Sequence, residues 1–351
     1  MKQPLVTRRK ALAGLGSLAA ASPLVADHPP KLIGEPPGRI APRVDLVNVL
    51  EFENMAARKL APDVYATIAG GDRSFFERIT FRPRMMVPTT HLDLTVSLFG
   101  EKMFAPVMVG PMARLQNYHP DGEVGMVRAA SGAKSWMVVS SESSLPVEKI
   151  AAESKTTLWY QVFAEEDMSA VRAKMEQAVK AGCKAICITL GAPRPNGKAR
   201  PAANWAKIDQ MRKGLDVPVL IKGILTPEDA GAALKHGING IVVSNYGGLS
   251  LHGTASSMEL LPSIVDALGG KAPILIDGSF RRGSDIFKAL AYGATAVMLG
   301  RPLVWGLAAY GPEGAQQVLE MLQTEVARDM AHCGRLTIKD IDRTVVKLHE
   351  V

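Results

Sequence analysis

The chain has 351 residues, of which 47% are hydrophobic and 21% are charged, a composition typical of a globular protein with a sizeable core. The formal net charge of +7 falls to +3 without the four basic residues of the first 26 positions. No dense basic run with interleaved aromatic residues follows, which argues against nucleic-acid binding. The cysteines Cys183, Cys187 and Cys333 lack the spacing of a zinc site, so we predict no metal site.

The N-terminal segment has the order of features that is typical of a secretory signal. Arg8 and Arg9 precede an apolar run of small residues over 11–21. The adjacent arginines resemble the twin-arginine type of signal, which exports folded and often cofactor-loaded proteins. The alternatives are an ordinary signal or a single anchoring helix, although the apolar run is too short to span a bilayer comfortably. We therefore predict a twin-arginine signal over 1–26 and an exported, periplasmic protein with no stable membrane span after signal removal.

Several elements are expected between the signal and the regular part of the chain. We predict a Pro/Gly-rich linker over 27–43, helices over 45–60 and 62–78, and an irregular or β lead-in over 81–98. Gly70 and Gly71 interrupt the second helix. We expect Met85 and Met86 to pack in the core, as most scattered methionines do.

From residue 106 onward, short apolar runs alternate with helical periodicity. Consecutive apolar residues are typical of parallel strands that are buried on both faces. The predicted strands are 106–110, 136–140, 158–163, 185–190, 217–222, 240–245, 274–277 and 296–300. The predicted helices are 121–131, 147–153, 168–181, 205–214, 227–236, 258–268, 284–292 and 314–331. Eight such units predict an α/β fold, a (β/α)8 TIM barrel with an N-terminal helical extension, over residues 44–351. The alternative is a doubly wound open sheet, which would not give eight evenly spaced units.

The most informative stretch, 274–302, contains two small-residue turns that follow neighbouring predicted strands. The turns contain Asp277, Gly278, Ser279 and Arg281 after the first strand, and Gly300 and Arg301 after the second. Backbone N–H groups at such turns can bind a phosphate, and Arg281 or Arg301 can neutralise it. The alternative is an ordinary strand–helix–strand unit with surface arginines.

Further polar residues fall at the carboxyl ends of predicted strands, where barrel enzymes build their sites. Ser140, Gln161 and Thr189 provide hydrogen-bonding groups that suit a polar heterocycle. Lys222 places a positive charge among them. It could form a Schiff base, stabilise negative charge on a bound cofactor, or pair with Asp277. We favour the cofactor role, because the surrounding strand ends are polar.

Five motifs in the chain resemble those of the FMN-dependent α-hydroxy acid oxidases and dehydrogenases, the glycolate oxidase and lactate oxidase group. The motifs are Phe81-Arg82-Pro83-Arg84, His119-Pro120-Asp121-Gly122-Glu123, Leu220-Ile221-Lys222-Gly223, Val243-Ser244-Asn245 and the stretch 277–301. The resemblance covers about residue 44 to the C-terminus and implies FMN as the cofactor. Related barrels often form tetramers, so a homo-oligomer is expected by analogy.

The resemblance also implies which residues bind FMN. Pro111, Met112 and Ala113 would line the flavin, and Ser140, Gln161 and Thr189 would hydrogen-bond its ring. Lys222 would lie near N1 and O2, with Ser244 nearby, and Asp277 would bind a ribityl hydroxyl. The phosphate would be held by Gly278, Ser279, Arg281, Gly300 and Arg301, although Ser279 stands where the family has glycine.

The substrate half departs from the family pattern. Tyr246 occupies the position of the family's catalytic histidine, and Leu249 that of a substrate-binding arginine. The remaining substitutions are Lys198 near the second arginine in a shortened loop, Thr67 and Phe163 for two tyrosines, Gly191 for the supporting aspartate and Glu142 for a tryptophan. A phenol is a poor base at neutral pH, and loss of the arginines removes bidentate carboxylate recognition.

Three hypotheses follow for the function. The first is an FMN-dependent oxidoreductase that acts on an unidentified small molecule other than a simple α-hydroxy acid, with Lys222 and Tyr246 as catalytic candidates. The second is an FMN-binding or partner protein whose catalytic residues have decayed. The third is residual 2-hydroxy acid dehydrogenase activity with Tyr246 or His252 as the base. Glu142 and Arg114 are further candidates for an acid, a base or an anion-binding group.

Overall fold

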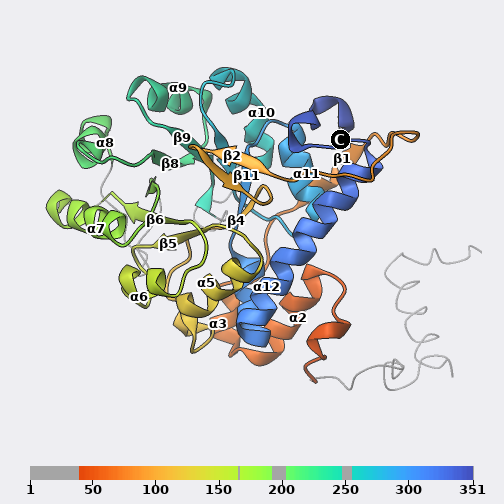
Figure 1. Cartoon of the computed structure of the whole chain (residues 1–351), viewed down its shortest axis with the longest axis horizontal. Helices are drawn as coiled ribbons and strands as arrows, with labels where there is room; N and C mark the ends of the chain where they lie inside the picture. The colour runs from red at the N-terminus through yellow and green to blue at the C-terminus, as the bar shows by residue number, and fades with distance from the viewer. Residues whose placement is uncertain (1–38, 165–166, 192–202, 247–254, 351) are drawn as a thin grey trace, which may run out of the picture. The chain divides into compact units, whose positions relative to one another are not determined.

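The computed structural model describes residues 39–164, 167–191, 203–246 and 255–350. Residues 42–351 form one compact unit. Its centre is a closed barrel of eight parallel strands in the order β10-β11-β4-β5-β6-β7-β8-β9 (Figure 1). The predicted (β/α)8 barrel is therefore confirmed. The predicted signal, and all but the last residues of the predicted linker, lie outside the described part of the chain.

The barrel strands are short and buried along their length. Their bounds are β4 (Val107–Val109), β5 (Met137–Ser140), β6 (Leu158–Phe163), β7 (Ile186–Thr189), β8 (Val219–Ile224), β9 (Gly240–Val243), β10 (Ile274–Ile276) and β11 (Ala296–Leu299). Each overlaps a predicted strand and differs from it by a few residues at the ends. The agreement follows from the consecutive apolar residues, which only a strand covered on both faces can bury.

Helices surround the barrel and cover the outer faces of the strands (Figure 1). Their bounds are α5 (Gly122–Gly132), α6 (Val147–Ala152), α7 (Met168–Lys180), α8 (Trp205–Arg212), α9 (Pro227–Lys235), α10 (Ser257–Leu268) and α11 (Gly283–Ala291). Side-chain caps fix several of the helix starts. Thr226, for example, accepts a hydrogen bond from the Asp229 backbone N–H at the start of α9.

The last helix starts earlier than predicted. Helix α12 (Arg301–His332) begins directly after β11, whereas the sequence predicted a helix over 314–331. A kink at Tyr310 and Gly311 separates its two halves, and Gly311 has a φ of +67°. Gly311 and Pro312 interrupt the helical pattern of the sequence, so the first half of the helix was not predicted. Among the described residues, no helix has the length and hydropathy needed to cross a membrane.

The N-terminal extension over 43–103, called the lead-in from here on and thus longer than the irregular stretch predicted over 81–98, packs against the barrel as separate short elements. They are η1 (Arg43–Asp45), α2 (Val49–Lys59), α3 (Pro62–Ala66), α4 (Ser74–Glu77), β1 (Ile79–Phe81) and the antiparallel pair β2 (Val96–Leu98) and β3 (Glu101–Met103). The predicted helix over 62–78 is thus two helices, separated at the Gly-Gly pair. Strand β1 pairs antiparallel with the C-terminal strand β12 (Val346–Leu348), so the C-terminus lies beside the lead-in (Figure 1).

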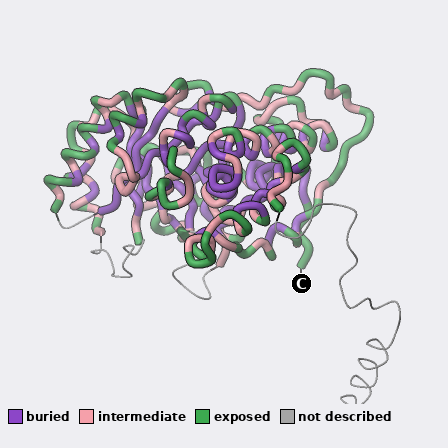
Figure 2. The backbone as a smooth tube through the Cα atoms, turned by 90° about the horizontal axis from the view of Figure 1, so that it is seen from below, coloured by how far each residue is buried: buried purple, intermediate pink, exposed green. Residues whose placement is uncertain are grey.

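The hydrophobic core fills the barrel and the layer between strands and helices, where the buried residues concentrate (Figure 2). Inside the barrel, Trp136 and Trp159 pack with their ring centroids 5.8 Å apart. Cys183, Cys187 and Cys333 are buried free thiols. The expectation that Met85 and Met86 are core residues is wrong, because their exposed fractions are 80% and 100%.

Truncation of a side chain in the barrel core should destabilise the fold. Leu220 is fully buried in β8, so Leu220→Ala leaves a cavity and should lower the free energy of unfolding by about 2 to 5 kcal/mol. The control Met85→Ala should change it by less than about 0.5 kcal/mol, because Met85 is exposed. Urea titration of both variants checks the prediction, and equal effects would contradict the assigned core.

Candidate functional site

A cavity of about 280 Å³ opens at the carboxyl ends of the barrel strands, on the side where barrel enzymes place their chemistry. Most of the predicted site residues line it. They are Pro111, Met112, Ala113, Lys222, Tyr246, Asp277, Gly278, Ser279, Arg281, Gly300 and Arg301. The cavity contains cations, a carboxylate, backbone turns and apolar surface, which together suit a ligand with an anionic end and a flat apolar part.

Three predicted polar residues form a buried hydrogen-bonded row. Ser140 Oγ donates to Gln161 Oε1 at 3.0 Å, and Gln161 Nε2 donates to Thr189 Oγ1 at 3.0 Å. The residues end or nearly end β5, β6 and β7, which are neighbours in the barrel. They lie beneath the cavity and do not belong to its lining. The row is an ordered polar layer at the centre of the barrel mouth.

Lys222 is the positive charge at the centre of this end of the barrel. Its side chain is 3% exposed, and Nζ lies 3.0 Å from Asp277 Oδ2 and donates to Ser244 Oγ at 2.9 Å. The sequence left open whether the lysine pairs with Asp277, and the structure shows this pair. A bulge follows directly, where Gly223 has a φ of +109° and a Cβ would lie 2.8 Å from the Leu190 carbonyl oxygen. The bulge requires glycine and sets the position of Lys222.

Arg281 and Arg301 lie close together at the other end of the cavity. Arg281 Nη2 donates to the Gly70 carbonyl at 2.8 Å, and its guanidinium lies 4.5 Å from the ring centroid of Trp305. Arg301 Nη1 donates to the Ala69 carbonyl at 3.4 Å. Burial, and then the charge of Arg301, lower the pKa of Arg281 to about 9. An anion between the two arginines would relieve this repulsion.

The lead-in passes close to the side chains of these two arginines at Gly71. Gly71 has a φ of +144°, and a Cβ there would lie 2.9 Å from Ser279 Oγ and 3.1 Å from Nη2 of both Arg281 and Arg301. Only a residue without a side chain permits this approach. The sequence showed the Gly-Gly pair as a helix break but gave no sign of the contact.

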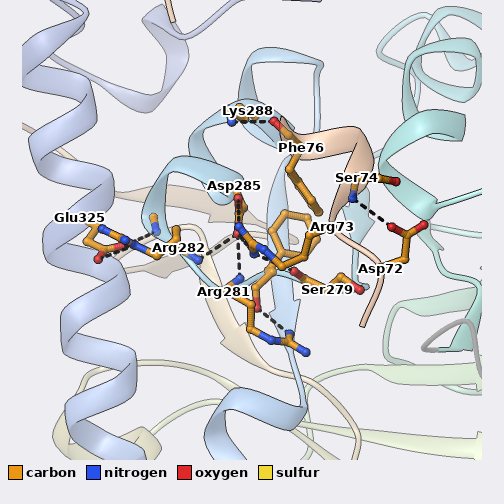
Figure 3. Close-up of polar contacts among 12 residues, drawn as sticks. Asp72, Arg73, Ser74, Phe76, Ser279, Arg281, Arg282, Asp285, Lys288 and Glu325 are labelled. Atoms are coloured by element: carbon orange, nitrogen blue, oxygen red, sulfur yellow. Dashed lines mark hydrogen bonds and ion pairs between the residues drawn. The ribbon is translucent and has the colours of Figure 1, made fainter. Parts of the chain in front are cut away.

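Charged residues that the sequence analysis missed hold the turn before α11. Asp285 of α11 pairs with Arg73 of the lead-in, and Glu325 of α12 pairs with Arg282 (Figure 3). Arg73 and Asp285 are 212 positions apart, and although Asp285 falls within the stretch 277–301, Arg73 belongs to none of the five motifs. No sequence signal could have brought them together without the barrel topology.

The opposite end of the cavity contains Tyr246. Its backbone has a φ of +50°, its ring centroid lies 5.1 Å from Lys222 Nζ, and its ring meets that of Phe163 edge-on at 6.4 Å. Thr67 Oγ1 and the Tyr118 hydroxyl oxygen are 2.8 Å apart in the same lining. The proposed substitutions at Lys198 and Leu249, and the alternative base His252, lie outside the described residues.

Two buried polar atoms beside the cavity, Asp277 Oδ1 and Asn245 Oδ1, have no hydrogen-bond partner among the residues that the structure describes. Both are acceptors, so a ligand hydroxyl or N–H group would satisfy them. Among the described residues, no cluster of three or more His, Cys, Asp or Glu side chains could hold a metal ion.

The family can be assigned from comparison with known proteins. The profile of the FMN-dependent dehydrogenase family matches residues 67–200 and 194–348. The chain belongs to this family. The resemblance expected from the motifs is confirmed, and the protein is an FMN-dependent oxidoreductase.

Relatives and solved structures of the FMN-dependent dehydrogenase family match nearly the whole barrel. The L-lactate oxidase of Nostoc sp. is 34% identical over 86% of this chain and 98% of the relative. The glycolate oxidase of Spinacia oleracea is 32% identical over 86% of this chain and 95% of the relative. A crystal structure of mandelate oxidase superposes with a TM-score of 0.82 at 34% identity, covering 87% of this chain and all of the other.

One carboxyl group of α12, near the ion pair between Glu325 and Arg282, has a shifted pKa. Asp329 lies one helical turn after Glu325 on α12. Burial, and then the charge of Glu325, raise its pKa from the usual 3.8 to about 6. The folded protein therefore retains this proton at pH values where the unfolded chain has lost it. The stabilisation is complete below pH 4 and is lost as the pH rises through 6.

Asp329→Asn should remove this pH dependence. At pH 7.5 the variant should be more stable than the wild type by about 1 kcal/mol, a figure well below full conversion of the shift because the group is only partly buried. At pH 4 the two proteins should differ little. Urea unfolding at both pH values measures the difference, and a gain that is equal at both would contradict the shifted pKa.

Proposed function

We propose that FMN binds in this cavity with its phosphate at the turns after β10 and β11 and its ring at the opposite end. The phosphate ligands would be Arg281, Arg301, Ser279 and the backbone at Gly278 and Gly300. Helix α12 begins directly after Gly300, so its N-terminal N–H groups also face this region. Asp277 would bind a ribityl hydroxyl.

The ring would lie over the segment after β4 and above the buried polar row. Its neighbours would be Pro111, Met112, Ala113, Ser140, Gln161, Thr189 and Ser244, with Lys222 near N1 and O2. The residues fit this group, because within the described ranges Asp277 Oδ1 is an acceptor without a partner and the two arginines form no ion pair with a carboxylate. When bound, FMN supplies a ring that accepts a hydride equivalent.

Lys222 would stabilise the negative charge of the reduced ring from a fixed position. Its side chain is buried and held by two partners, so little reorganisation is needed when charge develops nearby. The ion pair with Asp277 and the hydrogen bond to Ser244 Oγ together keep the lysine ammonium group in place.

We further propose that the substrate is not a simple α-hydroxy acid. The observation that carries this proposal is the place of Tyr246. Its ring centroid lies 5.1 Å from Lys222 Nζ, and the residue stands where the family has its catalytic histidine. A phenol cannot replace imidazole as a general base at neutral pH. Phe163, in place of one tyrosine, also removes a phenol hydroxyl from the substrate end, and Thr67, in place of another, replaces a phenol with a shorter aliphatic hydroxyl. Tyr246 would instead donate a hydrogen bond to a substrate oxygen or stack on the flavin.

A panel of 2-hydroxy acids tests the substrate proposal. The FMN-loaded protein, mixed anaerobically with lactate, glycolate or mandelate, should keep its visible flavin absorbance, whereas dithionite should bleach it. Tyr246→His places the family's base in the cavity, and slow bleaching by one of the acids in this variant alone would support the assignment. Bleaching of the wild type would overturn it and favour residual activity. If no reductant from a broader screen is accepted, a binding role gains support.

Removal of the charge at Lys222 should affect both affinity and redox potential. Lys222→Met leaves Asp277 without its cation and the reduced ring without a counter-charge. The FMN dissociation constant should rise about tenfold or more, and the flavin midpoint potential should become more negative. Flavin fluorescence and spectroelectrochemistry measure the two quantities. Lys235→Met, at the exposed end of α9, is the control and should change neither.

We also propose that the protein is exported through the twin-arginine route and forms a homo-oligomer, a tetramer by family analogy. The proposal of export rests on the adjacent residues Arg8 and Arg9. A full-chain fusion in which both become lysine should stay in the cytoplasm, whereas the unaltered fusion should reach the periplasm. Analytical ultracentrifugation of the purified protein tests the second proposal.

A further inference from the structure

The turn between β10 and α11 has an unusual backbone. Gly278 has a φ of +111°, and Ser279 follows with a φ of +58°. Two consecutive residues in the left-handed region bring the Ser279 side chain and the backbone of the turn toward the cavity. A non-glycine residue in this region is strained, so contacts with the rest of the protein must hold the turn in place.

Asp285, close to the start of α11, stabilises the connection between β10 and α11. Its Oδ2 accepts hydrogen bonds from the backbone N–H groups of Arg281 at 2.8 Å and Arg282 at 2.9 Å. The Asp285 side chain is 2% exposed. A buried carboxylate that accepts from two successive N–H groups fixes the direction in which the Arg281 side chain leaves the backbone.

Arg73 holds the same turn from outside. Its Nη1 and Nη2 lie 2.6 Å and 3.2 Å from the two carboxylate oxygens of Asp285, in a bidentate pair (Figure 3). Nη1 also donates to the Ser279 carbonyl at 3.2 Å. Arg73 therefore binds both the strained residue and the carboxylate that orders the turn. Because Asp285 is buried, the loss of this cation would leave its charge poorly compensated.

We infer that Arg73 is a positioning residue for the flavin phosphate. It does not face the cavity itself, and it acts by holding Ser279 and Arg281 in the geometry that the phosphate requires. The inference rests on the proposed placement of FMN. It assigns a role in cofactor selection to the lead-in, which lies outside the barrel strands.

The competing explanation is that Arg73 only fastens the lead-in to the barrel. A second contact allows the two roles to be separated. Lys288 of α11 donates to the Phe76 carbonyl at 2.8 Å and so joins the same lead-in to the same helix. Among the described residues it forms no hydrogen bond with the turn, and it acts on Asp285 and Arg73 only through its charge. A fastening role predicts the same effect for both residues, whereas a positioning role predicts an effect of Arg73 on phosphate recognition alone.

The test compares FMN with riboflavin, which lacks the phosphate, on the full-chain protein stripped of flavin. Fluorescence quenching gives the two dissociation constants for the wild type, Arg73→Met, Arg73→Lys and Lys288→Met. We expect Arg73→Met to weaken FMN binding about tenfold and riboflavin binding less than twofold. Arg73→Lys should recover part of the loss, because one ammonium cannot reproduce the bidentate pair. Lys288→Met should leave the ratio of the two constants unchanged.

Three other outcomes would each overturn the inference, and the dissociation constants distinguish them. A wild type that binds FMN no more tightly than riboflavin would remove the proposed phosphate site as well. A wild-type preference that persists in Arg73→Met would overturn the role of Arg73 alone. Loss of both flavins in Arg73→Met and in Arg73→Lys would show a structural role, because a positioning residue for the phosphate leaves ring binding intact.

Discussion

The proximity of two guanidinium groups, the buried one of Arg281 and the half-buried one of Arg301, constrains the structure around them. Within the described part of the chain neither pairs with a carboxylate, and backbone carbonyl groups accept their hydrogen bonds instead, those of Gly70 and Ala69 in the lead-in and that of Phe280 next to Arg281. The lead-in must therefore run across the barrel mouth, and Gly71 is needed where it passes both arginines. The turn that contains Arg281 is also fastened on both flanks, through Asp285 and through Glu325. Barrel, lead-in and α12 all contribute to the position of these two arginines.

The barrel could be predicted because its strands are buried on both faces and leave a periodic signal. Elements that depend on long-range packing were harder to predict. The start of α12 was placed too late because Gly311 interrupts the pattern, although the helix resumes beyond it. Met85 and Met86 were assigned to the core by their hydrophobicity, yet they lie in an exposed stretch of the lead-in. Hydrophobicity determines how strongly a residue prefers burial, while the tertiary fold determines whether it lies in the core.

The candidate site was predictable to the extent that barrel topology brings strand ends together. Lys222, Asp277 and Ser244 lie on neighbouring strands, and they meet as the strand order requires. The pair between Arg73 and Asp285 was not predictable, because a short helix outside the barrel brings one partner to the other. The two proposed halves of the cavity also differ in kind. The proposed cofactor half is tightly hydrogen-bonded within the protein, whereas the proposed substrate half contains Tyr246 and its edge-on contact with Phe163.

The pairing of β1 with β12 has a consequence for the order in which the molecule assembles. Thr80 and His349, which contact each other across this pair, are 269 positions apart, so the contact has a very high sequence separation. During synthesis β1 emerges before the barrel strands, and β12 emerges after all of them. The pair between β1 and β12 can therefore form only once the sequence of the whole barrel is available, and it fastens the segment before the barrel to the segment after it.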